Sequence, residues 1–179
     1  MIKYLVLLTI LFTCLSTFAY ADQNCLTKKT SEIVKVFDKG IVLNEKFKKS
    51  VGENDKEEYQ RLRKGGEQYS EETVIPCVQR AAQLLSKHSN PRLMHKLMEL
   101  VISYENSADE MISYSMGKVF AANPAAIENA IKTFPEPDRK LISNSVWAGW
   151  VNVKPELPSK LVKNRDKRIK FILPSVDSP

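Results

Sequence analysis

The sequence predicts an all-α fold: a compact bundle or a short, solenoid-like array of helical hairpins, with five to seven helices and one disulfide. Three observations lead to this prediction. From residue 70 onward the apolar residues recur at helical spacing, at i, i+3, i+4 and i+7. Asn-Pro steps at residues 90–91 and 123–124 stand where two of these patterns begin. Two cysteines, Cys25 and Cys77, follow the expected N-terminal signal.

Residues 1–21 are expected to form a secretory signal peptide. Lys3 precedes an apolar run from Leu5 to Leu15, and Ala19-Tyr20-Ala21 offers the small residues that a signal peptidase accepts. A lipid-modified Cys14 is the alternative, but the two residues before it are bulkier than that reaction expects. The run is shorter than the roughly 20 residues that span a membrane, and no later segment reaches that length. We therefore expect a soluble mature chain, periplasmic or secreted.

The two remaining cysteines predict one disulfide, as an isolated pair does in an exported protein. A Cys25–Cys77 bond would close a loop of about 50 residues, which the chain-entropy model values at roughly 4 kcal/mol. The sequence has no Cys-x-x-Cys motif, so we expect a structural bond and not a redox site.

The N-terminal third is expected to hold two helices. Thr30 or Ser31 can cap a first helix, which Gly40 is expected to end. A second helix is expected across roughly residues 55–63, in a strongly charged stretch. The sequence Lys64-Gly65-Gly66 then predicts a break and a mobile loop.

Two helices with distinct apolar faces are expected next. The first begins at Ser70 or Thr73, because Pro76 is tolerated only in a first turn. Cys77 belongs to its apolar face, so the disulfide would tie the N-terminal segment to this helix. The second begins with Asn90-Pro91, a good N-cap followed by proline at the first helical position. Its apolar face consists of Leu93, Met94, Leu97, Met98, Val101 and Ile102.

Three further helix starts are expected in the C-terminal half. Ser107 and Glu110 have the spacing of a capping box. Asn123-Pro124 opens the next helix, and Pro135-Glu136-Pro137 ends it and starts the last one of the domain. Residues 168–173, "RIKFIL", alternate in polarity and predict a short strand or an extended tail.

The two Asn-Pro steps are 33 residues apart, and the apolar positions that follow them align. Such a period is typical of solenoids built from antiparallel helix pairs. A third step 33 residues earlier would fall at Glu57, where there is no Asn-Pro. A true duplication and a coincidence of two good helix starts therefore both remain open.

The sequence divides into residues 1–21 (signal), 22–153 (helical domain) and 154–179 (basic C-terminal helix or tail). The formal net charge is +6, and removal of Lys3 leaves +5. Residues 154–170 hold seven basic and two acidic residues, so this charge lies in the tail. Such a segment suits an acidic protein, an anionic lipid or a polysaccharide, or is a solvated surface. Export argues against nucleic acid as the partner. The tail residues expected to bind are Lys160, Lys163, Arg165, Lys167 and Arg168.

Trp147 and Trp150 are the other binding candidates. They are three residues apart on one side of a predicted helix, and Gly149 would let another backbone approach closely. Most buried tryptophans are core residues, whereas an exposed one is a good anchor for a protein partner.

Signals for catalysis are weak. The sequence has no Gly-x-Ser-x-Gly, His-Glu-x-x-His or glycine-rich phosphate loop, and we expect no metal and no cofactor. Glu105, Asp109 and Glu110 surround a predicted helix bend and could serve as paired carboxylates for glycoside cleavage. Acidic residues at a helix start are, however, ordinary complements of the helix dipole.

The build of the chain, small, exported and helical with one disulfide, resembles that of bacterial immunity proteins, which block toxic enzymes in the periplasm. The resemblance covers the build alone and no motif. It implies a non-enzymatic protein that binds a protein partner in the cell envelope as an inhibitor, immunity protein or adaptor. An envelope hydrolase and a binder of anionic lipid or glycan are the alternatives.

Overall fold

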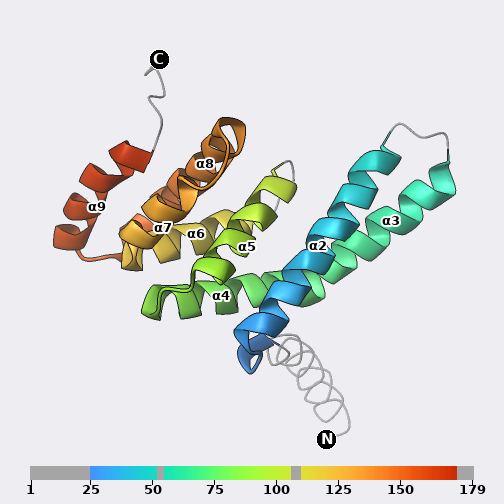
Figure 1. The fold of residues 1–179 in the computed structure, drawn as a ribbon, viewed down its shortest axis with the longest axis horizontal. Coiled ribbons are helices and arrows are strands. Elements are labelled where there is room, and N and C mark those ends of the chain that lie inside the picture. The colour runs from blue at the N-terminus through green and yellow to red at the C-terminus, as the bar shows by residue number, and fades with distance from the viewer. Residues whose placement is uncertain (1–24, 52–54, 106–109, 173–179) are drawn as a thin grey trace, which may run out of the picture.

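The computed structural model describes residues 25–51, 55–105 and 110–172, and every regular element in these ranges is helical (Figure 1). The all-α prediction is therefore confirmed. The predicted signal peptide and residues 173–179 of the predicted tail lie outside the described residues.

The elements follow one another with short connections. In chain order they are α2 (Thr30–Ser50), α3 (Lys56–Tyr69), the π-helical turn η1 (Ser70–Val74), α4 (Ile75–Lys87), α5 (Pro91–Ser103), α6 (Glu110–Ala122), α7 (Pro124–Ile131), α8 (Glu136–Val153), the 3-10 turn η2 (Lys154–Glu156) and α9 (Ser159–Ile172). Because α3, η1 and α4 are continuous, the described chain forms seven separate rods, within the predicted range of five to seven.

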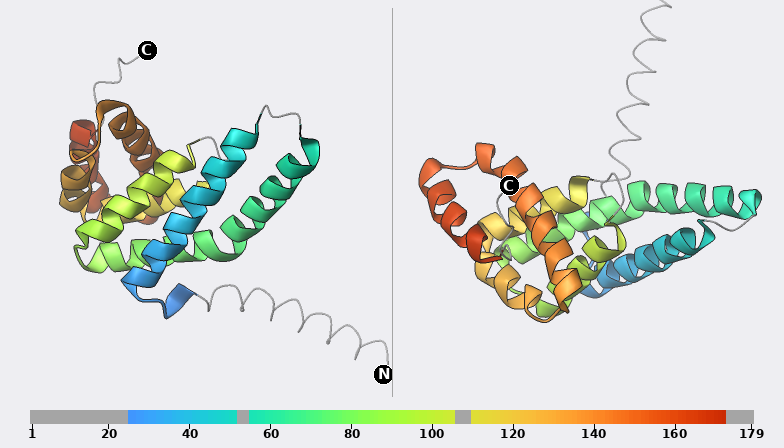
Figure 2. Two further views of the ribbon diagram at one scale, coloured as in Figure 1. Left: turned by 45° about the vertical axis from the view of Figure 1, so that its right-hand side comes forward. Right: turned by 90° about the horizontal axis from the view of Figure 1, so that it is seen from above.

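The helices form an array of antiparallel hairpins in two layers. Helices α4, α6 and α8 pack side by side in one layer, and α2, α5, α7 and α9 follow one another in the second. Figures 1 and 2 show α2 and α3 at one end of this array and α9 at the other. The two helices that begin with Asn-Pro, α5 and α7, are neighbours in the second layer, although α7 is shorter.

Both Asn-Pro steps start helices as predicted. The side-chain oxygen of Asn90 accepts a hydrogen bond from the backbone N–H of Leu93 at 3.0 Å, and that of Asn123 accepts one from the N–H of Ala126 at 3.3 Å. The prolines that follow lie in the first helical turn, where the missing N–H has no intrahelical partner to lose.

The prediction that Gly40 ends the first helix is wrong, because α2 continues to Ser50. Gly40 is buried where α2 crosses η1 and α5. A Cβ at this position would lie 3.0 Å from Cγ2 of Val74 and 3.5 Å from the hydroxyl oxygen of Tyr104. The glycine therefore permits a close helix crossing.

The predicted break at Gly65-Gly66 is also wrong, because α3 runs through both glycines to Tyr69. Contacts with α2 hold α3 in place: the rings of Phe47 and Tyr59 are 5.4 Å apart, and the Lys39 ammonium lies 4.4 Å from the centre of the Tyr69 ring. These contacts offset the helix-weakening effect of the two glycines.

No helix starts at Ser70 or Thr73, contrary to prediction, because α3 passes into α4 through the wide turn η1. In this turn the N–H of Ile75 bonds to the carbonyl of Ser70, five residues earlier. Pro76 follows directly. A proline inside a helix lacks an N–H and collides with the carbonyl four residues before it, and a π-helical turn relieves both conflicts.

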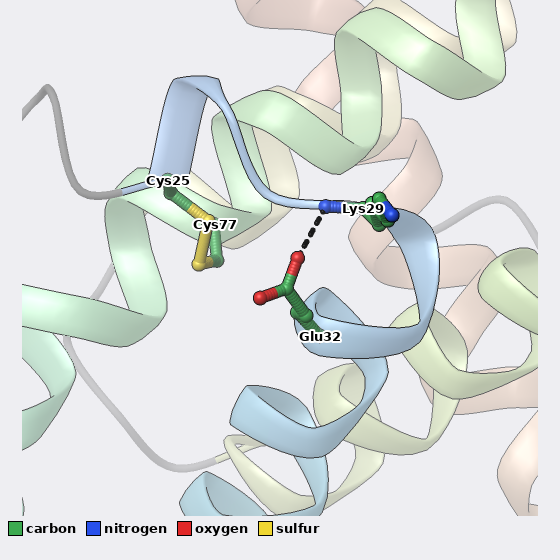
Figure 3. Close-up of a disulfide and its surroundings, with 4 residues drawn as sticks. All are labelled: Cys25, Lys29, Glu32 and Cys77. Carbon is green, nitrogen blue, oxygen red and sulfur yellow. Dashed lines mark hydrogen bonds between the residues drawn. A yellow bond between two sulfur atoms is a disulfide. The ribbon is translucent and has the colours of Figure 1, made fainter.

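The predicted disulfide joins Cys25, ahead of α2, to Cys77 in α4, with the two Cα atoms 5.2 Å apart (Figure 3). Both cysteines are buried in the core. Beside the bond, the N–H of Lys29 donates to the Glu32 carboxylate at 2.8 Å and so closes the start of α2. The N-terminal segment is thus fixed to the centre of the α3–α4 rod.

Helices α6 and α8 cross with their backbones in close contact. A Cβ on Gly149 would overlap the backbone carbonyl of Ser113, and a Cβ on Gly117 would overlap the backbone of Gly149. The hydroxyls of Ser113 and Ser145 share a hydrogen bond of 2.9 Å at the same crossing. Each helix thus offers serine and glycine four residues apart, and the prediction that Gly149 admits another backbone is confirmed.

Candidate functional site

The basic segment folds as α9, and the strand or extended tail predicted for residues 168–173 is wrong over the described residues 168–172. Ile169 and Ile172 are buried on the side of α9 that faces the body. The Ser143 hydroxyl of α8 donates to the Ile172 carbonyl at 3.0 Å. Over so short a run, the apolar residues fit both the two-residue period of a strand and the period of a helix. The alternation in the sequence therefore reflects one apolar side of a helix.

Two of the predicted binding residues, Arg165 and Arg168, attach α9 to the body. The Arg165 Nε donates to the carbonyl of Ala121 at 2.9 Å, at the C-terminal end of α6. Arg168 donates two hydrogen bonds to the Glu128 carboxylate of α7, at 2.8 and 2.6 Å. Burial lowers the pKa of Arg165, whereas the hydrogen bond with Glu128 raises the pKa of Arg168. Both guanidinium groups are therefore occupied within the chain.

The two tryptophans have different environments. Trp150 is 1% exposed, packs edge-on against Phe120, and donates from its indole N–H to the Asp166 carboxylate of α9 at 2.8 Å. The Lys154 ammonium lies 3.4 Å from the same carboxylate. Trp147 is 48% exposed on the surface of α8. Of this pair, only Trp147 is accessible to a partner.

Replacing Trp150 by phenylalanine should lower the free energy of unfolding by about 2 kcal/mol, because the change removes a hydrogen bond to a charged and partly buried acceptor. The same change at Trp147 is expected to have an effect within about 0.5 kcal/mol, since that ring is half exposed and no polar partner is lost. Urea denaturation of the two variants measures the difference. Equal effects at both positions would contradict the assigned roles.

Four lysines of α9 share the side that points away from the body, and we call this set the lysine face. They follow one another at intervals of three, four and three residues, which places them along one side of a helix. All four are exposed, and none forms an ion pair with a described residue. The set is Lys160, Lys163, Lys167 and Lys170.

An open groove of about 1080 Å³ borders the lysine face at the corner where η2 leads into α9. We call it the corner groove. Leu157, Val162 and Phe171 give it apolar surface, and the last of these is 86% exposed. The remaining lining residues are Lys154, Pro155, Ser159, Lys163, Asp166, Lys167 and Lys170. Apolar surface flanked by ammonium groups suits a ligand that is both acidic and partly apolar.

Two of the three candidate carboxylates lie within the described residues, and neither is buried. Glu105 and Glu110 are both exposed, and Asp109 lies outside the described residues. Glu105 lines a cavity of about 320 Å³ between α5, α6 and α8 whose described lining includes no second carboxylate. In the described part of the chain, no group of three or more His, Cys, Asp or Glu residues could hold a metal.

No protein-family model, curated protein or solved structure matches this chain. Among the described helices, none combines the length and the apolar character needed to cross a membrane. The candidate site therefore rests on the geometry of α9 and the corner groove. Sequence reasoning missed Lys170 and Phe171 as site residues. The spacing of the four lysines could have revealed Lys170, whereas the role of Phe171 depends on where η2 packs.

Proposed function

We propose that the mature chain is an exported, non-catalytic protein that binds an acidic protein partner in the cell envelope through the lysine face of α9. One observation carries the proposal. The arginines of α9 are engaged with α6 and α7, whereas its four outward lysines form no ion pair with any described residue. Such ammonium groups are available to the carboxylates of a partner.

The charges alone would give a weak complex. Exposed ion pairs contribute about 0.2 to 1 kcal/mol each, and their main effect is to speed the encounter and orient the partner. Apolar contact must supply the rest of the affinity. The corner groove with exposed Phe171 adjoins the lysine face, and Trp147 with Val151 adds exposed apolar surface on α8.

The attachment of α9 also favours a binding role. Hydrogen bonds from Trp150, Arg165 and Arg168 hold the helix in one position. A surface that is already ordered loses little conformational entropy when a partner binds. Inhibitors, immunity proteins and adaptors all require such a surface, and the identity of the partner distinguishes these roles.

Capture from an envelope extract of the source cell tests the proposal, with the disulfide-bonded mature protein as bait. The lysine-face variant carries glutamine at Lys160, Lys163, Lys167 and Lys170. A matched control carries the same four changes at exposed lysines of α2 and α3, namely Lys35, Lys46, Lys49 and Lys64. Mass spectrometry identifies the retained species after washes at low and high salt.

We expect the wild type and the control to retain one acidic protein, and the lysine-face variant to retain about tenfold less of it, because four ion pairs are lost. Raising the ionic strength should weaken capture by the wild type, since exposed charges are screened. Unchanged retention by the lysine-face variant would refute the proposal. Retention of only lipid or polysaccharide would refute the proposal that the partner is a protein.

A further inference from the structure

We infer that the partner presents an acidic amphipathic α-helix, which lies along α9 with its carboxylates on the lysine face and an apolar side chain in the corner groove. This inference rests on the proposed function and specifies the recognition element. It follows from the length and width of the lysine face, from the register of its charges, and from the groove beside it.

The lysine face is long and narrow. Lys160 and Lys170 are ten residues apart, which is about 15 Å along a helix axis. At about 100° per residue the four lysines occupy only about 80° of the circumference of α9. On one side the face is bordered by Phe171 and Asn164, and on the other by Asp166, which is engaged with Trp150. The positive surface is therefore a narrow strip along the axis of α9.

The register of the lysines fits a helical partner. Carboxylates at positions i, i+3, i+7 and i+10 of a helix also span about 15 Å along one side, so each meets one ammonium group of a helix packed alongside. An extended chain presents every second residue on one side, and four such carboxylates span about 20 Å. The carboxylates of an extended chain would therefore not align with the four ammonium groups of the lysine face.

The corner groove offers apolar surface beside the lysine face. Leu157 and Val162 are half-buried in it, and Phe171 projects at its edge near Lys170. A partner helix laid on the lysine face would direct a neighbouring side chain into this groove and cover the exposed ring. Removal of that apolar surface from water favours a helix that is amphipathic as well as acidic.

A bilayer fits this geometry less well than a helix does. An anionic membrane presents a plane of charge, which meets a broad surface and does not enter a groove beside a helix. Membrane-surface helices bury a wide apolar side, whereas the outward side of α9 offers one large apolar residue, Phe171. The observations therefore favour a protein helix, and anionic vesicles serve as a comparison in the test.

The test uses two labelled synthetic peptides of identical composition and about 20 residues, long enough for helix formation to be measurable. In the matched peptide, glutamates with the 3-4-3 spacing occupy one side and leucines the adjacent side. In the redistributed peptide, the same residues are spread around the helix. Fluorescence anisotropy gives the dissociation constants for the full mature protein, and vesicles of phosphatidylglycerol and phosphatidylcholine provide the membrane arm.

The matched peptide should bind about tenfold more tightly than the redistributed one, and the lysine-face variant should lose about tenfold of that affinity. Phe171→Ser should weaken binding about threefold without changing the melting temperature, since this side chain is exposed. The control with four changes in α2 and α3 should bind within about twofold of the wild type.

Equal binding of both peptides would overturn the inferred helix register. Binding to phosphatidylglycerol vesicles without binding to the matched peptide would overturn the helical partner in favour of a membrane surface. Failure of the proposed function is detected separately, because the lysine-face variant would then capture as much envelope protein as the wild type does.

Discussion

Replacing Gly149 by alanine is expected to lower the free energy of unfolding by about 3 kcal/mol or more. The added Cβ would overlap the carbonyl of Ser113, and backbone cannot move aside as the end of a flexible side chain can. Helices α6 and α8 would have to separate, which would also break the hydrogen bond between the Ser113 and Ser145 hydroxyls. Gly117→Ala should have a comparable effect, because its Cβ would overlap the backbone of Gly149.

Guanidinium denaturation monitored by circular dichroism measures this effect. Gly65→Ala is the matched control, because no atom lies within 4 Å of a Cβ at that exposed position of α3. This control should be stabilised by up to about 1 kcal/mol, as is usual when alanine replaces glycine inside a helix. A Gly149→Ala protein with the denaturation midpoint of the wild type would show that the backbones of α6 and α8 do not pack this closely.

Loss of the Cys25–Cys77 disulfide is expected to reduce the free energy of unfolding by roughly 4 kcal/mol. The two cysteines are 52 positions apart, so the bond removes many conformations from the unfolded chain. It also fixes the start of α2 to α4, two elements that share few other contacts. Cys77 is fully buried, so its replacement also leaves a small packing defect.

The measurement compares denaturation midpoints of the wild type with and without reductant. The double variant Cys25→Ala, Cys77→Ala provides the control, because reductant should leave its midpoint unchanged. Reactive thiols at Cys25 and Cys77, or a midpoint that does not respond to reduction, would contradict this expectation. Because both changes are made together, neither position keeps an unpaired thiol that could form incorrect crosslinks.

The parts of the fold that depend on local chemistry could be predicted from the sequence. Asn90 and Asn123 cap helices through atoms only three residues away, so no knowledge of the tertiary structure was needed. The errors arose where packing overrides local preference. Gly40 and Gly65-Gly66 are helix breakers in isolation, but contacts from other helices keep both segments helical.

In the candidate site, too, local features could be predicted from the sequence, whereas long-range contacts could not. The spacing of the lysines is a local property, and it predicts which of them share a side of α9. The engagement of Arg165 with Ala121, and of Arg168 with Glu128, joins residues about 40 positions apart, so the sequence could not separate these arginines from the lysines. For the same reason, nothing local distinguished buried Trp150 from exposed Trp147.

The two ends of the helical array are closed by different means. A covalent bond secures the N-terminal end, whereas α9 closes the other end through hydrogen bonds and two buried isoleucines. Where each hairpin contacts mainly its neighbours, opening proceeds inward from the weaker end. Fraying should therefore be one-sided, with amide hydrogens of α9 exchanging sooner than those of α4. The proposed binding surface lies on the terminal unit that opens most readily, so an occupied site would retard unfolding of the whole array.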